Sequence, residues 1–305
     1  MRIAIIGLGN QGRKRQVVAG HDVVATVDPY NPEASYKEVG QIPLNFFDAG
    51  FVCTSDDAKP EIVEYLIGAG KHVLVEKPLL ISDAEYFSKL SDLGAQNGVI
   101  CYTGYNHRFE PHIGNLKKVL ETGELGAVYS IRFFYGNGTA RDTKLSDWRD
   151  QGMGVISDLG SHLLDLSLFL FGEQRTDFEL WSGARFENRA FDHAIFASRG
   201  KPLIEMEVSL LSWRNNFTID LYAEAGSAHI AGLCKWGPSS FTVRRRILPS
   251  GKPTEECSVL ERSDPTWELE YQHFKDLCQA GHVDCGRDQW IDSMLHNLTR
   301  DGTGQ

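Results

Sequence analysis

The sequence predicts two domains, an α/β domain built on a parallel sheet and an α+β domain built on a mainly antiparallel one. The first prediction rests on short apolar runs that alternate with helical patterns as far as residue 104. The second rests on longer apolar runs that follow one another beyond that point. A Gly-x-Gly-x-x-Gly pattern after the first apolar run indicates a tight turn from a strand into a helix.

The α/β domain is predicted to span residues 1–104. Strands are expected where apolar runs lie between turn residues, and helices where apolar residues recur three or four positions apart. The expected strands are 2–6, 23–27, 51–54, 72–75 and 99–103, and the expected helices are 12–19, 60–69 and 82–96. The segment 29–48 is short and Pro-rich for a full strand and helix, so this corner of the sheet should be reduced.

The α+β domain is predicted to span residues 105–305. Partial alternation of apolar and polar residues favours antiparallel strands that follow one another along the chain. The expected strands are 128–135, 178–186, 193–198, 203–213 and 217–223, and the expected helices are 111–120, 156–171, 267–280 and 288–298. The pattern leaves open whether the last helix packs back on the first domain.

Composition excludes several classes of protein. The 305 residues carry a net charge of −10, and no basic patch of the nucleic-acid type stands out. There is no run of 18 apolar residues and no signal-peptide pattern, so we expect no membrane span and a cytoplasmic location. Six cysteines without CxxC spacing favour reduced thiols, so neither a disulfide framework nor a metal site is expected.

The glycine pattern predicts a dinucleotide site. Gly7 would make the tight turn, Gly9 would let a pyrophosphate approach the backbone, and Gly12 would allow close helix packing. The helix that follows offers free N–H groups to the phosphates, which adds Asn10 and Gln11 to the predicted cofactor contacts. A glycine turn without a ligand is the alternative interpretation.

Asp28 ends the second expected strand, 16 residues beyond the last glycine of the pattern. A carboxylate there can accept hydrogen bonds from the adenosine ribose and would repel a 2′-phosphate, which favours NAD over NADP. A simple turn aspartate before Pro29 is the alternative. The basic segment 13–15 leaves NADP open, although we expect these three residues to form a solvated face.

Lys77 ends another expected strand, between Glu76 and Pro78. The carboxyl ends of strands are where open α/β sheets bind ligands. Pro78 restricts Lys77 to extended geometry and makes a cis peptide bond between them an option. We therefore interpret Lys77 as a site residue, with a solvated surface lysine as the alternative.

A second constellation lies on the helix expected at 156–171. Asp158, His162 and Asp165 are spaced at i, i+4 and i+7, so on a regular helix they would share one face. Buried ionisable groups are costly unless they are paired or used, and a histidine beside carboxylates suits general acid/base chemistry. A helix cap and a satisfied core histidine form the alternative. Asn106 follows the strand 99–103 and could hold substrate hydroxyls or a phosphate.

These motifs together resemble the Gfo/Idh/MocA family of oxidoreductases. The matching segments are Gly-Leu-Gly-Asn-Gln-Gly at 7–12, Glu-Lys-Pro at 76–78, Gly-Tyr-Asn-His-Arg-Phe at 104–109, and Asp-Leu-Gly-Ser-His at 158–162. The resemblance implies a Rossmann domain and an open-faced sheet domain. It further implies a homo-oligomer, a dimer or tetramer formed through that sheet.

The resemblance also implies roles for individual residues. Lys77 would polarise the reacting oxygen and contact the cofactor, His162 would be the general acid/base, and Asp158 would bind substrate or tune His162. The segment Trp148-Arg149 is similar to one in members that act on sugar nucleotides, which adds three residues to the predicted substrate pocket: Lys144, Trp148 and Arg149.

The sequence departs from the family pattern near residue 54. The family often shows Thr-Pro-x-x-x-His there, whereas this chain has Thr54-Ser55-Asp-Asp-Ala-Lys59. Thr54, Ser55 and Glu76 are still expected to contact the cofactor.

The resemblance predicts an NAD(P)-dependent dehydrogenase that transfers a hydride between nicotinamide and a carbinol carbon. The substrate would be a sugar, a sugar derivative such as a nucleotide sugar, or a cyclitol. Two alternatives stay open: a non-catalytic sensor that binds NAD(P), and a reductase of an imine or a conjugated double bond.

Overall fold

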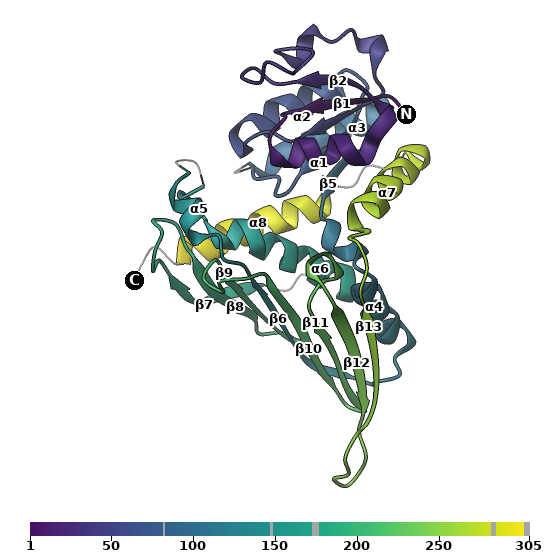
Figure 1. The fold of residues 1–305 in the computed structure, drawn as a ribbon, viewed down its shortest axis with the longest axis vertical. Helices are drawn as coiled ribbons and strands as arrows, with labels where there is room; N and C mark the ends of the chain where they lie inside the picture. The colour runs from purple at the N-terminus through teal and green to yellow at the C-terminus, as the bar shows by residue number, and fades with distance from the viewer. Residues whose placement is uncertain (82, 147–148, 173–176, 282–284, 302–305) are drawn as a thin grey trace. The chain divides into compact units, whose positions relative to one another are not determined.

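The computed structural model describes residues 1–81, 83–146, 149–172, 177–281 and 285–301 (Figure 1). The chain divides into two compact units, Met1–Asn106 with Thr266–Asp292, and His107–Pro265 with Ser293–Gln305. The predicted fold class is confirmed, because one unit holds a parallel sheet and the other a mainly antiparallel one. The domain boundary at residue 104 stays a prediction, since compactness alone does not show which part folds independently.

The first unit is built on a five-stranded sheet in the order β2-β1-β3-β4-β5. All four pairs of neighbouring strands are parallel, so crossover helices join them and cover both faces. The order reverses direction at β1 and β3, which creates a crevice outside their carboxyl ends. The strands are β1 (Ile3–Ile6), β2 (Val23–Val27), β3 (Ala49–Val52), β4 (His72–Glu76) and β5 (Cys101–Gly104).

Each face of this sheet has its own hydrophobic core. Helices α2 (Lys59–Gly68) and α3 (Ala84–Asn97) supply the core on one face. Helices α1 (Asn10–Ala19) and α7 (Thr266–Ala280) supply the other, where Phe274 lies edge-on to Phe51 with ring centroids 5.4 Å apart. The late segment 266–280 therefore completes a face of the parallel sheet that would otherwise carry one helix.

The segment 29–48 is reduced, as the sequence predicts. It holds two 3-10 turns, Val39–Gln41 and Leu44–Phe46, in place of a full helix. A single parallel bridge between Val27 and Tyr36 stands where a further edge strand would lie. This leaves the crevice bordered by loop residues on the side of β2.

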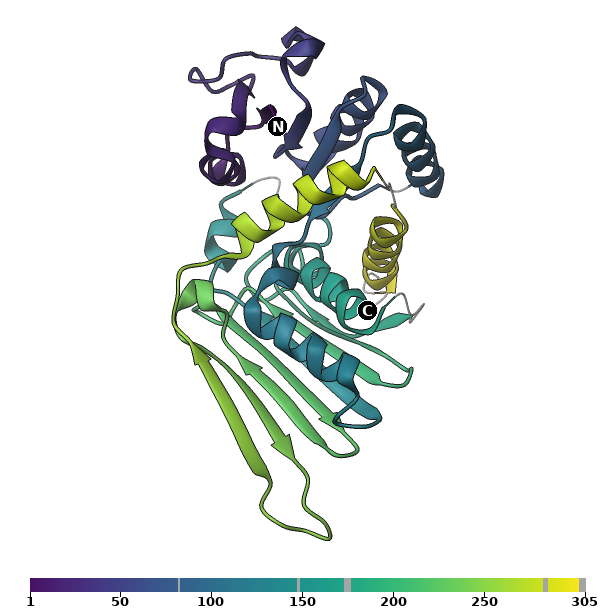
Figure 2. The ribbon, with the colours of Figure 1, turned by 90° about the vertical axis from the view of Figure 1, so that its right-hand side faces the viewer.

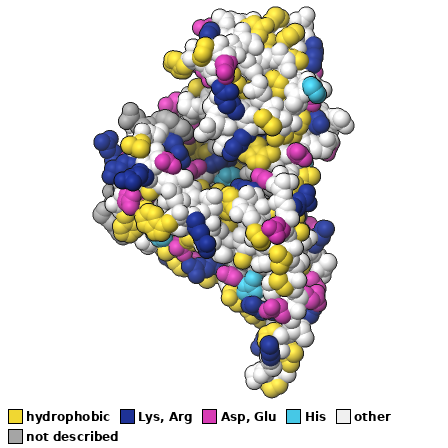
Figure 3. Space-filling model, viewed as in Figure 1, with side chains coloured by type: hydrophobic (Ala, Val, Ile, Leu, Met, Phe, Trp, Pro, Cys, Tyr) yellow, Lys and Arg dark blue, Asp and Glu magenta, His cyan; other side chains and the backbone are white. Residues whose placement is uncertain are grey.

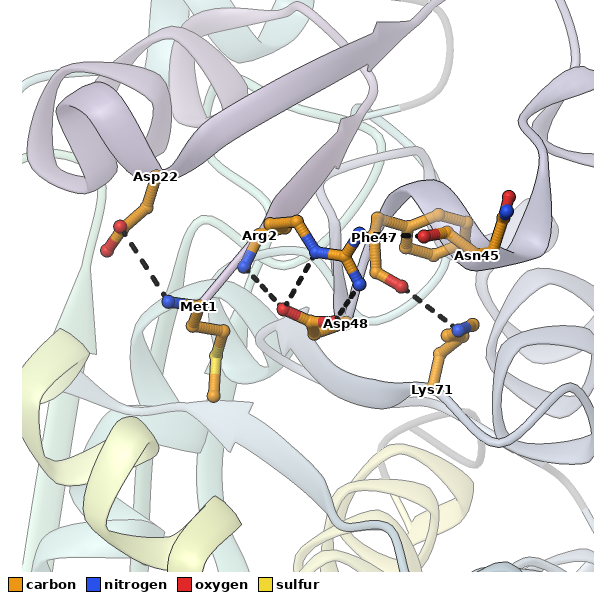
Figure 4. A network of polar contacts seen from close by, with 7 residues as sticks. All are labelled: Met1, Arg2, Asp22, Asn45, Phe47, Asp48 and Lys71. Atoms are coloured by element: carbon orange, nitrogen blue, oxygen red, sulfur yellow. Dashed lines mark hydrogen bonds and ion pairs between the residues drawn. The ribbon is translucent and has the colours of Figure 1, made fainter.

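A polar network closes the amino ends of these strands (Figure 4). The Arg2 guanidinium donates to the Asp48 carboxylate and, through Nη1, to the Asn45 carbonyl at 2.7 Å. The hydrogen bond from Arg2 lowers the pKa of Asp48. The Lys71 ammonium donates to the carbonyl of Phe47 at 3.0 Å. The amino edge is thus tied together by internal bonds, on the side of the sheet away from the expected ligand site.

The second unit is built on an eight-stranded sheet in the order β13-β12-β11-β10-β6-β9-β8-β7. Every neighbouring pair is antiparallel except β6 with β9. The strands that sequence analysis predicts at least in part are β6 (Val128–Gly136), β7 (Phe178–Ala184), β8 (His193–Ser198), β9 (Leu203–Ser209) and β10 (Asn216–Ala223). Three further strands went unpredicted: β11 (Gly226–Ala231), β12 (Ser239–Arg245) and β13 (Thr254–Leu260).

Helices cover one face of this sheet. Figure 2 shows α4 (Pro111–Thr122) and α6 (Ser161–Phe171) lying against the same side. Alternate residues of the strands turn toward these helices, and Ile131, Phe133 and Ile219 are fully buried there. The remaining helices of the chain are α5 (Ala140–Lys144) and α8 (Gly286–Asp301).

The intervening residues of the same strands form an open, charged face. Arg132 on β6 pairs with Glu205 and Glu207 on β9, and Asp220 on β10 pairs with His229 on β11. Figure 3 shows side chains of both charge signs interspersed over this sheet. The predicted open-faced sheet is therefore present.

Two elements differ locally from their predictions. The strand expected at 203–213 ends at Ser209, and Trp213 lies in a turn with a left-handed φ of 60°. The helix expected at 156–171 begins with a π-helical turn at Ile156–Gly160, followed by α6. A π turn is wound wider than an α turn, which changes the face on which the residues before α6 lie.

Candidate functional site

The glycine turn after β1 has the geometry of a dinucleotide cradle. Gly7 has a φ of +93°, and a Cβ there would lie 2.6 Å from the Cys53 carbonyl oxygen. A Cβ on Gly12 would lie 1.8 Å from the Gly7 carbonyl oxygen, so helix α1 packs too closely on the turn for any side chain. A Cβ on Gly9 would meet no atom within 4 Å. Gly9 therefore faces open space, which is what a pyrophosphate needs in order to reach the backbone.

A cleft of about 730 Å³ lies beside this turn, at the carboxyl ends of β1, β2 and β3. Among the predicted cofactor residues, it is lined by Gly7, Gly9, Asp28, Thr54 and Ser55. The hydroxyl oxygen of Thr54 is buried and has no hydrogen-bond partner among the described residues. A buried polar atom on the wall of a cleft is a natural contact for a polar ligand.

Asp28 is held rigidly at the carboxyl end of β2. Its Oδ2 accepts the Leu8 N–H at 2.9 Å, and its Oδ1 accepts the N–H groups of Tyr30 and Asn31, each at 2.9 Å. Partial burial opposes the charge, but the three backbone donors outweigh it and lower the pKa of Asp28. A fixed carboxylate results, with lone pairs left for a ribose diol.

These features fit a nicotinamide dinucleotide. The open space at Gly9 and the first N–H groups of α1, at Asn10 and Gln11, suit the pyrophosphate. Asp28 suits the adenosine ribose, and the Thr54 hydroxyl supplies a further polar contact.

Glu76, at the end of β4, belongs to a buried ion-pair triad. Arg15 Nε donates to Glu76 Oε1, and Arg15 Nη1 donates to Glu270 Oε2 on α7, both at 2.6 Å. Burial by itself disfavours the cation, but Glu270 and Glu76 together raise the pKa of Arg15. The prediction that Arg15 lies on a solvated face is therefore wrong, because its guanidinium is 1% exposed. The cofactor contact expected of Glu76 stays a prediction.

Lys77 follows directly, half-buried, and its peptide bond to Pro78 is cis. Lys59 lies close by at the start of α2, with a side chain that is 3% exposed. Its ammonium donates to Asp56 Oδ1 at 2.6 Å and to the Pro78 carbonyl at 2.9 Å. Burial lowers the pKa of Lys59, and the nearby charge of Lys77 adds to this effect. Lys59 stands where the family pattern has histidine, and it ties the loop after β3 to the segment after β4.

Asn106 is buried at the end of the first unit's continuous segment. Its side-chain amide donates to the Thr266 hydroxyl at 2.9 Å. This bond joins the segment after β5 to the start of α7. The predicted substrate contact of Asn106 stays a prediction.

In the second unit, the predicted polar stripe is divided. Asp165 is fully buried and forms an ion pair with Arg108. Asp158 lies on the π turn, where Arg149 Nη2 is 3.5 Å from its carboxylate and 38% of its side chain is exposed. The physical reason is the π turn, which breaks the regular i, i+4, i+7 spacing ahead of α6. Asp165 thus has a structural partner, and Asp158 remains accessible.

His162 lies at the first turn of α6, 7% exposed, among aromatic rings. Its ring centroid is 3.9 Å from that of His107 and 6.0 Å from that of Tyr135. Burial, with a contribution from Asp158, raises the pKa of Tyr135, so its phenol stays protonated. The Lys235 ammonium lies 2.8 Å from Nε2 of His107. Sequence reasoning did not assign a role to His107 or Lys235, and the 128 residues between them leave no local signal.

Two further predicted substrate residues, Lys144 and Arg149, lie in the segment between β6 and α6. Lys144 ends α5 and is exposed, whereas Arg149 is half-buried against Asp158. Trp148 lies outside the described residues. Among the described residues, no helix is long and apolar enough to cross a membrane, and no group of three or more His, Cys, Asp or Glu side chains could hold a metal ion.

Known proteins match both parts of the chain. Residues 1–105 match the oxidoreductase family with an NAD-binding Rossmann fold, and residues 113–229 match the GFO/IDH/MocA C-terminal domain. Glucose-6-phosphate 3-dehydrogenase of Bacillus subtilis is 34% identical over 34% of this chain and 31% of its own length. Trans-1,2-dihydrobenzene-1,2-diol dehydrogenase of Bos taurus is 24% identical over 92% of this chain and 81% of its own length.

A similar fold is found in the solved structure of levoglucosan dehydrogenase in complex with NADH and levoglucosan. The TM-score is 0.84 at 16% identity, over 99% of this chain and 97% of that one. The alignment with the Bacillus subtilis relative spans less than two thirds of that protein, so the relatives establish kinship and leave the activity to be argued from the site. The two matched domains, in the order that the motifs predict, show that the chain belongs to the Gfo/Idh/MocA family of oxidoreductases.

Proposed function

We propose that the protein is an NAD(P)-dependent dehydrogenase that acts on a carbinol group. The observation that carries the proposal is the presence of both a dinucleotide cradle, open at Gly9, and two groups suited to acid/base chemistry, the accessible Asp158 and the buried His162. A protein that only sensed the dinucleotide would not need Asp158 and His162. When bound, the nicotinamide supplies the hydride acceptor or donor.

The residues divide the remaining chemistry among them. As a carbinol is oxidised, its hydroxyl proton must leave with the hydride, and His162 would accept that proton as general base. The Lys77 ammonium would donate a hydrogen bond to the reacting oxygen and stabilise the charge that develops on it. Asp158, held by Arg149, would bind a substrate hydroxyl or stabilise the imidazolium of His162.

We propose a polyhydroxylated substrate: a sugar, a sugar derivative such as a nucleotide sugar, or a cyclitol. Relatives support this class, since one is a glucose-6-phosphate 3-dehydrogenase and another is an inositol 2-dehydrogenase. Asn106, Lys144, Trp148 and Arg149 are the proposed substrate contacts. Amide, ammonium and guanidinium groups are suitable donors to hydroxyls and phosphates.

We propose NAD as the preferred cofactor. The fixed, ionised carboxylate of Asp28 would accept the ribose hydroxyls and repel a 2′-phosphate. Lys37 also lines the cleft, but its ammonium donates to the Asn31 carbonyl at 2.9 Å. The Lys37 ammonium is thus bonded to a backbone carbonyl.

We also propose a homo-oligomer formed through the open face of the eight-stranded sheet. That face combines the ion pairs of Arg132 and His229 with exposed aromatic rings at Tyr129 and Tyr222. Aromatic residues and arginine are enriched in protein interfaces. Light scattering should give a dimer or tetramer, and a monomer at all concentrations would contradict this proposal.

The function is tested by ligand binding and turnover measured on the same protein. A thermal-shift screen with NAD and NADP should show stabilisation by NAD, since a ligand that binds the folded state stabilises it. Reduction of NAD should then be measured over sugars, nucleotide sugars and cyclitols. Tight NAD binding without turnover on this panel would support the sensor instead.

The roles are tested by Lys77→Ala and His162→Ala. Each should lower kcat by at least a hundredfold, and His162→Ala should leave the affinity for NAD nearly unchanged. The matched controls are Lys89→Ala and His21→Ala, because both residues are exposed and lie outside the site. Full activity in either site variant would contradict the role assigned to that residue.

A further inference from the structure

A second histidine lies directly behind His162. His107, in the 3-10 turn Asn106–Phe109, is 1% exposed, and its ring contacts His162 at a centroid distance of 3.9 Å and a tilt of 54°. Tyr135 lies edge-on to His107, with ring centroids 5.2 Å apart. The imidazole of His107 is therefore fixed in place by aromatic packing against the proposed acid/base.

Lys235 determines the protonation state of His107. Its ammonium can only donate hydrogen bonds, so Nε2 of His107, 2.8 Å away, must be the acceptor. Nδ1 then carries the proton, and the ring is neutral. Protonation of Nε2 would remove this bond and place a second positive charge beside the ammonium, which is doubly unfavourable. Lys235 itself lies in the 3-10 turn Cys234–Trp236, with Nζ 4.7 Å from the Trp236 ring centroid.

Two carboxylates near the two histidines pair with arginines, and on the Lys235 side the charges that act on neighbouring Cys234 are those of Glu110, Asp264 and Arg262. Asp165 on α6 pairs with Arg108, and Asp158 on the π turn pairs with Arg149. The Tyr135 phenol on β6 stays protonated. On the Lys235 side, the Glu110 carboxylate accepts from the backbone N–H and Sγ of Cys234, each at 3.1 Å. Burial and this carboxylate raise the pKa of Cys234 to about 12, so the thiol is neutral.

We propose that Lys235 is a positioning residue that acts through His107 to favour the neutral, proton-accepting form of His162. A cation within 2.8 Å of His107, whose ring contacts that of His162, disfavours a further positive charge on His162. Neutral His162 is the form that accepts a proton, so this arrangement favours oxidation of the alcohol over reduction of the carbonyl. The assignment of direction rests on the dehydrogenase function proposed above, whereas the effect on His162 does not.

The effect on His162 is tested without substrate, by NMR titration of the histidine C2–H signals. Signals of His107 and His162 are assigned from His107→Gln and His162→Gln. In Lys235→Met, the midpoint of the His162 titration should move upward by about 1 on the pH scale, because a nearby positive charge is lost. Lys235→Arg should keep the wild-type titration. The control Lys118→Met, an exposed position on α4, should also leave it unchanged.

A purely structural role for Lys235 predicts a different result. Lys235→Gln keeps a donor for Nε2 of His107 but loses the charge, so it should reproduce the change seen in Lys235→Met. It also serves as the second variant if Lys235→Met does not fold. Identical titration of His162 in the wild type and in Lys235→Gln would overturn the proposal.

Turnover then tests the direction. At a pH below both titration midpoints, Lys235→Gln should lower kcat for alcohol oxidation about tenfold, because a pKa of His162 raised by about 1 leaves about a tenth as much of the neutral base there. Raising the pH should restore the rate, and KM for NAD should not change. Equal loss at every pH would overturn the assignment of direction. A raised His162 titration in a protein without dehydrogenase activity would instead contradict the proposed function and leave the action of Lys235 on His162 supported.

Discussion

The buried triad around Arg15 should dominate the stability of the first unit. Arg15→Met keeps the aliphatic volume packed near Trp267, whose ring centroid is 4.5 Å from the guanidinium carbon. It removes the cation that lies between two carboxylates, Glu76 and Glu270, at 2.6 Å from each. The side chain of Glu270 is 0% exposed and that of Glu76 is 10% exposed, so water cannot replace the guanidinium. The variant must therefore bury two acids without the guanidinium that lies between them.

The expected cost follows from this burial. Removing one partner of a buried ion pair typically costs about 3–5 kcal/mol, because a charge is left unpaired. At about 2–4 °C for each kcal/mol, the midpoint of thermal unfolding should fall by roughly 10 °C. The two carboxylates should then bind protons more readily in the folded variant than in the unfolded chain. The deficit relative to wild type should therefore shrink as the pH is lowered.

The measurement is urea and thermal unfolding followed by circular dichroism at several pH values. Arg13→Met is a matched control, because Arg13 lies one half-turn away on the same helix and pairs with Glu33 on the surface, 54% and 68% exposed. An exposed pair contributes only about 0–1 kcal/mol. If Arg15→Met lost no more stability than Arg13→Met, or if its deficit grew toward acidic pH, the account of the triad would be refuted.

Three further predictions concern the cofactor side. Gly9→Ala should fold normally and bind NAD at least tenfold more weakly. Gly12→Ala should instead lower the unfolding temperature, since its Cβ would overlap the Gly7 carbonyl. Calorimetry measures both the binding and the unfolding temperature. Asp28→Asn should weaken NAD binding about tenfold and narrow the preference over NADP in a fluorescence titration, and an unchanged preference would contradict its role. Because burial lowers the pKa of Lys59 from its ordinary 10.5, the contribution of this residue to the unfolding free energy should rise with pH just below 10.5, where Lys59 binds its proton more fully in the unfolded chain. Lys59→Met should abolish that rise in urea titrations, and an identical pH dependence would contradict the burial of a charged Lys59.

The first unit could be predicted from sequence because its signals are local. The glycine turn, the buried strands and the residues at strand ends lie within segments of about ten residues, where periodicity and turn chemistry are informative. The strands β11 to β13 were missed because their sequences mix apolar and polar residues without clear boundaries. Their pairing depends on the register with β10, which is a long-range property.

The sequence singles out candidate site residues one by one, but it does not show which of them are paired. Asp158 and His162 stand out as ionisable residues on an apolar helix, yet the π turn that divides Asp158 from Asp165 leaves no sequence signature. Lys59 stands out in the sequence only as a departure from a pattern. Its bonds to Asp56 and to the Pro78 carbonyl exist because β3 and β4 are neighbours, a fact that emerges only from the assembled sheet.

The residues that sequence reasoning missed share one physical property, which is a charge matched by a partner far along the chain. Arg15 depends on Glu270, 255 residues away, and His107 depends on Lys235, 128 residues away. A charged side chain without a partner favours solvent. Such a residue is therefore reasonably predicted to lie on the surface unless its partner is known. Burial becomes possible only once the fold brings the partner within 3 Å. Each such pair therefore marks a place where the fold, and not the local sequence, decides the protonation state on which the proposed chemistry depends.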